Sequence, residues 1–333
     1  MTCARTAFAI MHIRLIDANS VGYAQHHAHD IRLSPAGFQA QAIAGMLMHV
    51  RRNIQYDPQI LNLLLWDGRA QWRYDLLPTY KGNRHGTLEQ REARAAYEAQ
   101  RPWIARALSS FPVMQARVAN AEADDLAWGL SRQLAAQGHF VSLYTADTDW
   151  LAMVASRVRW VNARKPSQVV EIDGFAKACQ YPFPQQVAAI KAIAGEDSDG
   201  INGVPDIALK RAQAILAKYG SLDGVLEAAA DPFRFSDEPK YYQSLALPEM
   251  QDLVRRNRQL VDLSRGPAID GSTVEVTTGA YDSLELYEIF HDLGFLQYLD
   301  AFNQWERALD REMPLSDVLS VKRAIANVAQ SWA

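Results

Sequence analysis

The stretch AEADDLAWGLSRQL, residues 121–134, gathers Glu122, Asp124 and Asp125 directly ahead of a helical pattern. Leucines follow at four-residue spacing, which predicts a helix that packs against the core and fixes the position of its first turn. A charged first turn that complements the helix dipole is the simplest interpretation. A third acid favours another one, because crowded carboxylates repel and raise one another's pKa unless cations share them. The cluster therefore indicates a metal site.

Other acids stand where predicted strands end. Short apolar runs predict buried parallel strands at residues 13–17, 61–67, 140–147 and 157–161. Helical stretches between them, such as 38–52, give the order expected of a doubly wound α/β sheet. The carboxyl ends of such strands share one edge, where ligands bind. We therefore expect Asp17, Asp67 and Asp147 to converge there, with Asp149 nearby, although a single acid at a strand end is often only a helix N-cap.

The residue types at this edge select the metal. The predicted ligands are carboxylates, with no cysteine and no histidine at metal-ligand spacing among them, which suits Mg²⁺ or Mn²⁺ better than Zn²⁺. The acids exceed what one ion needs. Two ions that share a phosphodiester are the usual arrangement for such a set. The histidines of HHAHD, residues 26–30, are expected to be solvated rather than to bind metal.

A basic segment covers residues 69–106, with eight Lys and Arg against four Asp and Glu. It includes LPTYKGNR, in which Lys81 and Arg84 flank a glycine beside Tyr80. These side chains are suited to a phosphate with a base stacked nearby. A solvated helix with a charge stripe explains EQREARAAYEAQR equally well, but it explains LPTYKGNR poorly.

A third pattern is GEDSDGINGVPDIALKRAQAILAKYGS, residues 195–221. Glu196 and Asp199 lie in a glycine-rich turn, and Pro205 is expected to begin a helix that ends at Gly220. Backbone N–H groups of such a loop can bind a DNA phosphate without reading its sequence. An ordinary surface turn between two helices is the alternative.

Composition sets wider limits. The 333 residues are 49% hydrophobic, which is enough for one large domain with appendages or for two domains. No apolar run approaches the roughly 20 residues of a membrane span, so we expect a cytoplasmic protein with no membrane partner. The sequence leaves the oligomeric state open, and a monomer is the default expectation. Two cysteines make a disulfide framework unlikely. A net charge of −4 taken alone argues against a nucleic-acid partner.

Five motifs occur in the order and approximate spacing of the 5′-nuclease (flap endonuclease) family: LIDANSVGYAQHHA, WDGRAQWR together with PTYKGNR, EADD, TADTDW and GEDSDGINGV. The chain resembles that family over about residues 13–225. The family includes the 5′–3′ exonuclease domain of bacterial DNA polymerase I and free-standing phage 5′-exonucleases. Five motifs in series are strongly specific where one would be weak.

The resemblance implies a fold and its division. It implies an α/β parallel-sheet, PIN-like nuclease core over residues 11–180, with a helical arch at about 75–110. A helix-three-turn-helix element that binds duplex DNA would follow at 181–225. Residues 226–333 read as amphipathic helices that pack back on the core.

The resemblance also implies the site residues. Carried over by position, the metal ligands are Asp17, Asp67, Glu122, Asp124, Asp125, Asp147, Asp149, Glu196 and Asp199. Lys81 and Arg84 fall on arch residues that engage the scissile phosphate. The DNA-binding residues would be Tyr80, Gly203, Val204, Ile207 and Lys210. With those acids assigned to metal, the rest of the chain is net positive, which removes the objection from charge.

We expect two Mg²⁺ ions, for which Mn²⁺ can substitute. One would be held largely by Asp67, Glu122, Asp124 and Asp125, and the other largely by Asp147, Asp149 and Asp199.

Two departures from the family pattern bear on these expectations. Glu196 stands where the family usually has Asp. The family's Gly-hydrophobic-Gly turn, which contacts the DNA backbone and often a K⁺ ion, is replaced by Asp206-Ile207-Ala208. The carboxylate of Asp206 is expected to repel phosphate, and it puts a bound K⁺ in doubt.

The expected function is a metal-dependent 5′–3′ exonuclease or flap endonuclease that acts on DNA with 5′ ends or flaps, and also on RNA·DNA hybrids. One alternative is a DNA-binding accessory protein that keeps the fold without the reaction. A chain free of metal binding has no physical reason to keep mutually repelling carboxylates. The other alternative is a PIN-type ribonuclease, a fold that lacks the GEDSDGINGV element and the long basic insertion.

Overall fold

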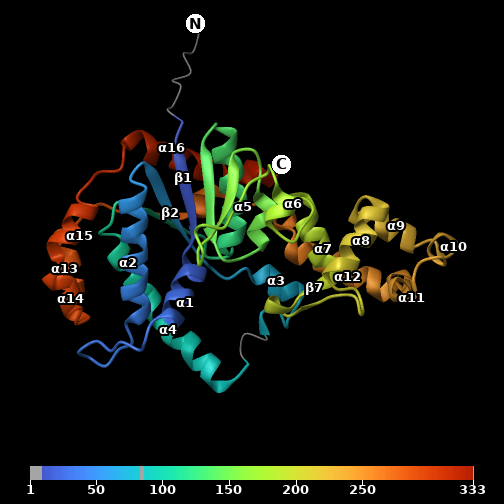
Figure 1. The fold of residues 1–333 in the computed structure, drawn as a ribbon, viewed down its shortest axis with the longest axis horizontal. Coiled ribbons are helices and arrows are strands. Elements are labelled where there is room, and N and C mark those ends of the chain that lie inside the picture. The colour runs from blue at the N-terminus through green and yellow to red at the C-terminus, as the bar shows by residue number, and fades with distance from the viewer. Residues whose placement is uncertain (1–9, 83–85, 333) are drawn as a thin grey trace, which may run out of the picture.

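A seven-stranded sheet forms the centre of the molecule, in the order β6-β5-β4-β1-β2-β3-β9 (Figure 1). The computed structural model describes residues 10–82 and 86–332. The strands are β1 (His12–Asp17), β2 (Ile60–Trp66), β3 (Met114–Arg117), β4 (Phe140–Thr145), β5 (Val158–Asn162), β6 (Val169–Val170) and β9 (Glu275–Thr278). Strands β1 to β5 run parallel, and β6 and β9 pair antiparallel at the two edges. The predicted α/β fold class is confirmed.

The strands form because both faces of the sheet are covered. All seven residues of β2, ILNLLLW, are buried, as expected for a parallel strand between two helical layers. Successive side chains of β1 enter different cores: Leu15 packs in one hydrophobic cluster and Ile16 in the other. The register pairs Leu15 with Leu63 on β2 and with Leu143 on β4, which places the ends of these strands side by side.

Two groups of helices cover the sheet. One core contains residues of α1 (Ala18–Ala28), α2 (Gln41–Tyr56), α4 (Leu88–Leu108), α13 (Ser283–Asp292) and α15 (Phe302–Leu309). The other contains residues of α5 (Ala123–Ala136), α7 (Val187–Ala194), α8 (Leu209–Tyr219), α9 (Leu222–Ala229), α12 (Pro248–Val261) and α16 (Leu315–Ala326). Shorter helices are α3 (Gln71–Leu76), α6 (Phe175–Ala178), α10 (Pro232–Phe235), α11 (Lys240–Gln243) and α14 (Leu296–Asp300).

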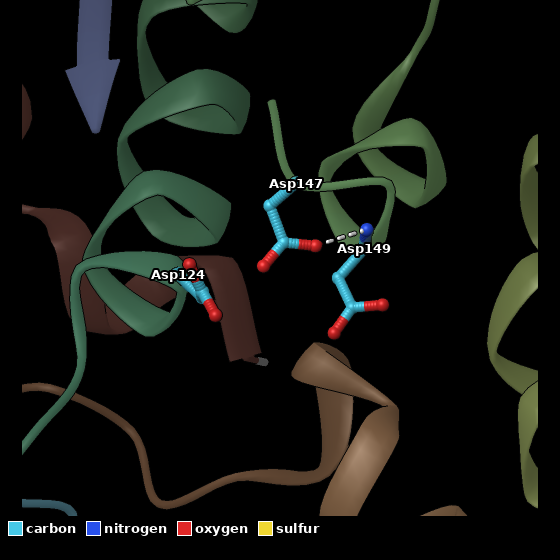
Figure 2. Close-up of side chains that lie close together, drawn as sticks. All are labelled: Asp124, Asp147 and Asp149. Atoms are coloured by element: carbon cyan, nitrogen blue, oxygen red, sulfur yellow. Dashed lines mark hydrogen bonds between the residues drawn. The ribbon is translucent and has the colours of Figure 1, made fainter. Parts of the chain in front are cut away.

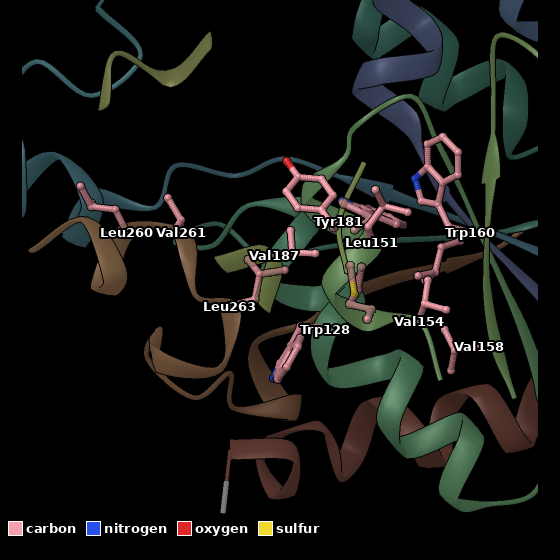
Figure 3. Close-up of a cluster of buried hydrophobic side chains, with 14 of the residues drawn as sticks. Trp128, Leu151, Val154, Val158, Trp160, Tyr181, Val187, Leu260, Val261 and Leu263 are labelled. Carbon is pink, nitrogen blue, oxygen red and sulfur yellow. The ribbon is translucent and has the colours of Figure 1, made fainter. Parts of the chain in front are cut away.

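Helices α7 to α12 extend to one side of the sheet, at the right in Figure 1. The two-residue strands β7 (Gly195–Glu196) and β8 (Ile201–Asn202) pair at the start of this region. Figure 3 shows the buried cluster that joins it to the sheet, with Trp128 of α5, Trp160 of β5, Val187 of α7 and Leu260 of α12. This packing fixes the loop after α7 relative to the strand ends.

The segment predicted as an arch, about residues 75–110, contains the end of α3, a turn and the long helix α4. A capping box begins α4: Thr87 accepts a hydrogen bond from the Gln90 N–H, and the Gln90 side chain accepts one from the Thr87 N–H. Arg84, one of the two predicted arch cations, lies outside the described residues.

Three strands of the seven-stranded sheet were not predicted from sequence: the two-residue β6, β3 and β9. Strand β3, MQAR, is only four residues long and mixes polar with apolar side chains, so it carries no strong pattern. Strand β9, EVTT, is mostly exposed and lies in the C-terminal region, where only helices were expected. Across the described residues, none of the helices is both long enough and apolar enough to cross a lipid bilayer.

Candidate metal-dependent nuclease site

The predicted carboxylates come together at the carboxyl edge of the sheet. Asp17 ends β1, Asp67 follows β2, and Asp147 and Asp149 follow β4. Glu122 is the N-cap of α5, and Asp124 lies in its first turn. Ligand oxygens of Asp124, Asp147 and Asp149 lie within 4.8 Å of one another, and Figure 2 shows the three side chains facing a common space.

Hydrogen bonds hold the first two acids in place. Oδ1 of Asp17 accepts from the Ser20 N–H at 2.9 Å, and its Oδ2 accepts from the Thr145 hydroxyl at 2.8 Å. Oδ1 of Asp67 accepts from the Ala123 N–H at 2.8 Å. Both carboxylates therefore act as helix caps, and Asp67 caps a helix that lies far from it in the sequence.

Side-chain and backbone donors also orient two of the three acids that share a space, Asp124 and Asp147. The indole N–H of Trp150, a fully buried residue, donates to Oδ1 of Asp124 at 2.6 Å. The Asp149 N–H donates to Oδ1 of Asp147 at 2.8 Å. These bonds leave an oxygen of each acid directed toward its neighbours, as a shared cation requires.

Burial and the neighbouring acids raise the pKa of three of these carboxyl groups. Burial, then the nearby Asp67, raises the pKa of Asp17 to about 6. Burial and the charge of Asp149 raise the pKa of Asp147 to about 7. Burial and the charge of Asp147 also raise the pKa of Asp124 well above its usual range. Hard cations would relieve this excess of negative charge, so the donor set fits Mg²⁺ or Mn²⁺.

Asp125 differs from the other acids. Both of its oxygens accept from the guanidinium of Arg73, at 2.6 and 2.8 Å, and Oδ2 also accepts from the Glu122 N–H at 3.0 Å. The side chains of this pair are 4% and 2% exposed. The pairing fixes α3 against the start of α5 and holds the backbone of Glu122 and Asp124.

Two arch residues contact the acids directly. The hydroxyl of Tyr80 lies 3.1 Å from an oxygen of Glu122 and 3.1 Å from one of Asp199. Nζ of Lys81 lies 2.6 Å from Glu122, and the Lys81 N–H donates to the Asp199 carbonyl. Tyr80 is only 4% exposed, so its ring is not available to stack on a base. The structure places it between acids of the core and of the α7–α8 loop.

A buried lysine joins the remaining predicted ligands. Nζ of Lys191, on α7, contacts Asp149, lies 2.6 Å from Glu196 and 3.3 Å from the Thr148 hydroxyl. Burial opposes its charge, but Asp149 and Glu196 outweigh that effect and raise the pKa of Lys191. A fixed positive charge therefore stands beside the three-acid cluster.

The α7–α8 loop uses part of its predicted phosphate-binding backbone internally. The N–H groups of Val204 and Ile207 donate to the carbonyls of Ile193 and Val204, and both side chains are buried. Gly203 is packed so closely that a Cβ would lie 2.1 Å from the Ala194 carbonyl oxygen. Lys210, in the first turn of α8, is exposed.

Asp206 has a φ of 65°, in the left-handed region. It therefore adopts the conformation that a glycine would take at the same point of the turn.

Replacing Asp206 with Gly is expected to raise stability by about 0.5–1 kcal/mol, because glycine adopts this φ without strain. It should also tighten duplex DNA binding, since a carboxylate that repels phosphate is removed. Asp206→Asn separates the two effects, as it removes the charge and keeps a side chain. Thermal unfolding and gel-shift titration in EDTA measure them. Weaker DNA binding by both variants would contradict the repulsion.

The roles of three residues at the site were not predicted from the sequence. Arg73 was counted only as part of a basic segment, and its partner Asp125 lies 52 residues away. Lys191 is part of an apolar helix pattern, VAAIKAIA, and nothing in its neighbourhood marked it. Trp150 could have been suspected, because it directly follows Asp149 in TADTDW.

Comparison with known proteins agrees with this geometry. Residues 12–180 match the family model described as the 5′-3′ exonuclease N-terminal resolvase-like domain. Residues 183–283 match the 5′-3′ exonuclease C-terminal SAM fold.

Curated relatives include DNA polymerase I of Bacillus subtilis, 22% identical over 91% of this chain and 34% of that protein. DNA polymerase I of Chloroflexus aurantiacus is 27% identical over 72% of this chain and 25% of that protein. The chain thus spans about a third or less of the length of these relatives.

Solved structures share the fold. Bacteriophage T5 5′-exonuclease with bound zinc has a TM-score of 0.64 at 21% identity, covering 76% of this chain and 89% of that one. A complex of T5 D15 flap endonuclease with DNA and metal ions also has a TM-score of 0.64, at 18% identity, covering 96% and 99%. Flap endonuclease-1 from Methanococcus jannaschii has a TM-score of 0.54 at 13% identity, covering 97% and 94%. With the family models matching both its sheet and its helical region, the chain belongs to the 5′-3′ exonuclease family.

Proposed function

We propose that the chain is a divalent-metal-dependent 5′ nuclease that hydrolyses phosphodiesters of DNA at 5′ ends or flaps. One observation carries the proposal: Asp124, Asp147 and Asp149 offer oxygens within 4.8 Å of one another at the sheet edge. Membership of the 5′-3′ exonuclease family supports it. The curated relatives are bacterial DNA polymerases, so we place the activity in the bacterial cytoplasm.

Two Mg²⁺ ions, or Mn²⁺ in their place, fit the carboxylates. Asp124, Asp147 and Asp149 are the first candidates to hold them, with Asp17 and Asp67 close by. When bound, such ions supply Lewis acidity to water and to the phosphate oxygens. Asp125 is already engaged by Arg73, so we assign it to positioning rather than to metal binding.

The chain's own cations act on the substrate side. Lys81 lies at the base of the arch against Glu122, from where its ammonium can neutralise a scissile phosphate that enters the site. The Tyr80 hydroxyl lies within hydrogen-bond distance of both Glu122 and Asp199, and it donates its proton to one of them at a time. Tyr80 therefore stands between the two carboxylates. The solved T5 D15 complex contains DNA, and we assign duplex binding in this chain to the α7–α8 region, which lies in the part that matches the C-terminal SAM fold. RNA·DNA hybrids are a second candidate substrate.

The test uses 5′-flap duplex DNA labelled at each end in turn, with Mg²⁺, Mn²⁺ or EDTA. Cleavage near the junction, or stepwise from the 5′ end, is expected with either metal and should be absent in EDTA. The position of the cuts shows which mode prevails. Binding without cleavage under both metals would contradict the proposal and favour an accessory role. Cleavage of single-stranded RNA alone would favour the PIN-type ribonuclease.

Lys191 gives a prediction about metal affinity. Its ammonium contacts Asp149 and Glu196, so it competes with a cation for the same carboxylates. Lys191→Met is expected to tighten Mn²⁺ binding by roughly tenfold, because a like charge near the ions is removed. Calorimetric titration with Mn²⁺ measures this without reference to cleavage.

The same variant should unfold at a lower temperature in EDTA, since two carboxylates lose their buried partner. Lys191→Arg keeps the charge and is the control. Weaker Mn²⁺ binding in Lys191→Met would show that the lysine orders the ligands rather than competing with the ions.

A further inference from the structure

A cavity lies between helices α1 and α2 and the strands β1, β4 and β5. It has a volume of about 920 Å³ and is lined by residues of α1, α2, β1, β4 and β5. Its lining includes Ala146, which directly precedes Asp147. It also includes Ser20, whose backbone N–H donates to Asp17. The cavity therefore reaches the carboxyl ends of β1 and β4, yet the proposed reaction uses none of its other residues.

The cavity is strongly basic. Its lining contains the arginines Arg14, Arg52, Arg159 and Arg164. Of the described residues that line it, Asp57 is the one acid, and it pairs with Arg14 at 2.6 Å. Arg159 lies 3.7 Å from Glu171, which is outside the cavity. In the described part of the chain no acidic side chain forms a salt bridge with Arg52 or Arg164. An anion that enters would meet two uncompensated guanidinium groups.

Polar and aromatic groups accompany this charge. Nε2 of His49 is buried and has no hydrogen-bond partner among the described residues. Burial, then Arg14 and Arg52, lowers the pKa of His49 to about 4, so its ring is neutral near pH 7. The rings of Tyr23 and His27 lie 4.6 Å apart, and Tyr144 lies 5.5 Å from His49. Flat rings beside guanidinium groups suit a ligand that combines phosphate with an aromatic base.

We propose that this cavity binds a phosphorylated nucleotide, with its phosphate at Arg52 and Arg164 and its base among the aromatic side chains. The volume is within the range of roughly 300–1,000 Å³ that small-molecule sites occupy. Two sources supply this chemistry: a free nucleoside monophosphate, or the terminal nucleotide of a 5′-phosphorylated strand. The inference does not depend on catalysis, because binding requires neither the carboxylates nor metal.

The test is equilibrium dialysis of radiolabelled thymidine 5′-monophosphate against the full chain in EDTA, where the carboxylates cannot bind phosphate through a metal. Saturable binding of one nucleotide per chain is expected. The double variant Arg52→Gln/Arg164→Gln should weaken it by about tenfold or more. Both arginines are exposed, so the fold should persist, which circular dichroism checks. Arg307→Gln, a similarly exposed arginine on α15, is the matched control and should leave binding unchanged.

Competition by tetrathymidylate with and without a 5′-phosphate identifies the source. Tighter binding of the 5′-phosphorylated strand than of the monophosphate supports a strand end, and the reverse supports a free nucleotide. Absence of saturable binding would overturn the proposal, as would equal binding by the double variant. Equally tight competition by inorganic phosphate would also overturn it, because the base would then contribute nothing.

Discussion

Asp147→Asn is expected to lower cleavage of flap DNA by about a thousandfold or more, while it raises the stability of the metal-free protein. The side chain keeps its shape, and its oxygen can still accept the Asp149 N–H. What it loses is a negative charge beside Asp124 and Asp149. That charge serves a cation and is unfavourable without one, so function and stability should change in opposite directions.

The pH dependence of this effect follows from the pKa of Asp147, raised from 3.8 to about 7. Between these values the folded chain holds a proton that the unfolded chain has released, so metal-free stability falls as pH rises. Asp147→Asn has no carboxyl group to titrate at this position, so its metal-free stability does not fall for this reason as pH rises. Its advantage in EDTA should be absent near pH 4, grow to about 4 kcal/mol near pH 7, and level off above that, because each pKa unit corresponds to about 1.4 kcal/mol.

Thermal unfolding from pH 4 to 8, in EDTA and in excess Mg²⁺, measures both sides of the prediction. Excess Mg²⁺ should stabilise the unmodified chain more than the variant. Asp173→Asn, at an exposed acid outside the site, is the control and should change neither cleavage nor the pH profile. Cleavage retained by Asp147→Asn at ordinary Mg²⁺ concentrations would refute the role of this cluster.

Arg73→Met is the second large effect. It leaves Asp125 buried without its guanidinium partner, and removing one member of a buried ion pair costs about 3–5 kcal/mol. The double variant Arg73→Met/Asp125→Asn removes both charges of this pair and should recover most of the loss, because the asparagine can still accept the Glu122 N–H. Glu122 also lies 3.3 Å from Arg73, but it keeps the Lys81 ammonium at 2.6 Å. Urea unfolding of the unmodified chain, the two single variants and the double variant gives a double-mutant cycle, which measures the coupling energy of the pair.

An exposed pair supplies the control for this cycle. Arg255 and Asp252 are 53% and 78% exposed, and Arg255→Met should cost about 0.5 kcal/mol or less. The double variant should also bind Mn²⁺ within a small factor of the unmodified chain, because we assign Asp125 to positioning. If the double variant is fully folded but no longer binds Mn²⁺, Asp125 is instead a metal ligand.

Local patterns were sufficient for the central strands and for the meeting of their acids. IRLID and LNLLLWD are apolar runs that end in an acid, and parallel pairing of β1, β2 and β4 places those ends together. The helix that begins near Asp125 was also predicted, because its leucine spacing is a property of one short segment.

Long-range pairing could not be predicted in the same way. The pairing of Arg73 with Asp125 depends on where α3 packs against α5. The residue spacing within either segment does not indicate that packing. Lys191 looks like part of a core helix until folding brings Glu196 and Asp149 to its ammonium. Tertiary packing therefore decides which acids pair with basic side chains and which are left to bind metal ions.

The antiparallel pairing of β3 with β9 has a consequence for the order of folding during synthesis. Residues 114–117 receive their outer partner only when residues 275–278 have been made, so β3 is an open edge for much of the chain's elongation. Open edges recruit other strands, and closing a contact over so long a separation is slow. A nascent chain that stalls before β9 is therefore the form in which this protein is most exposed to strand-to-strand association.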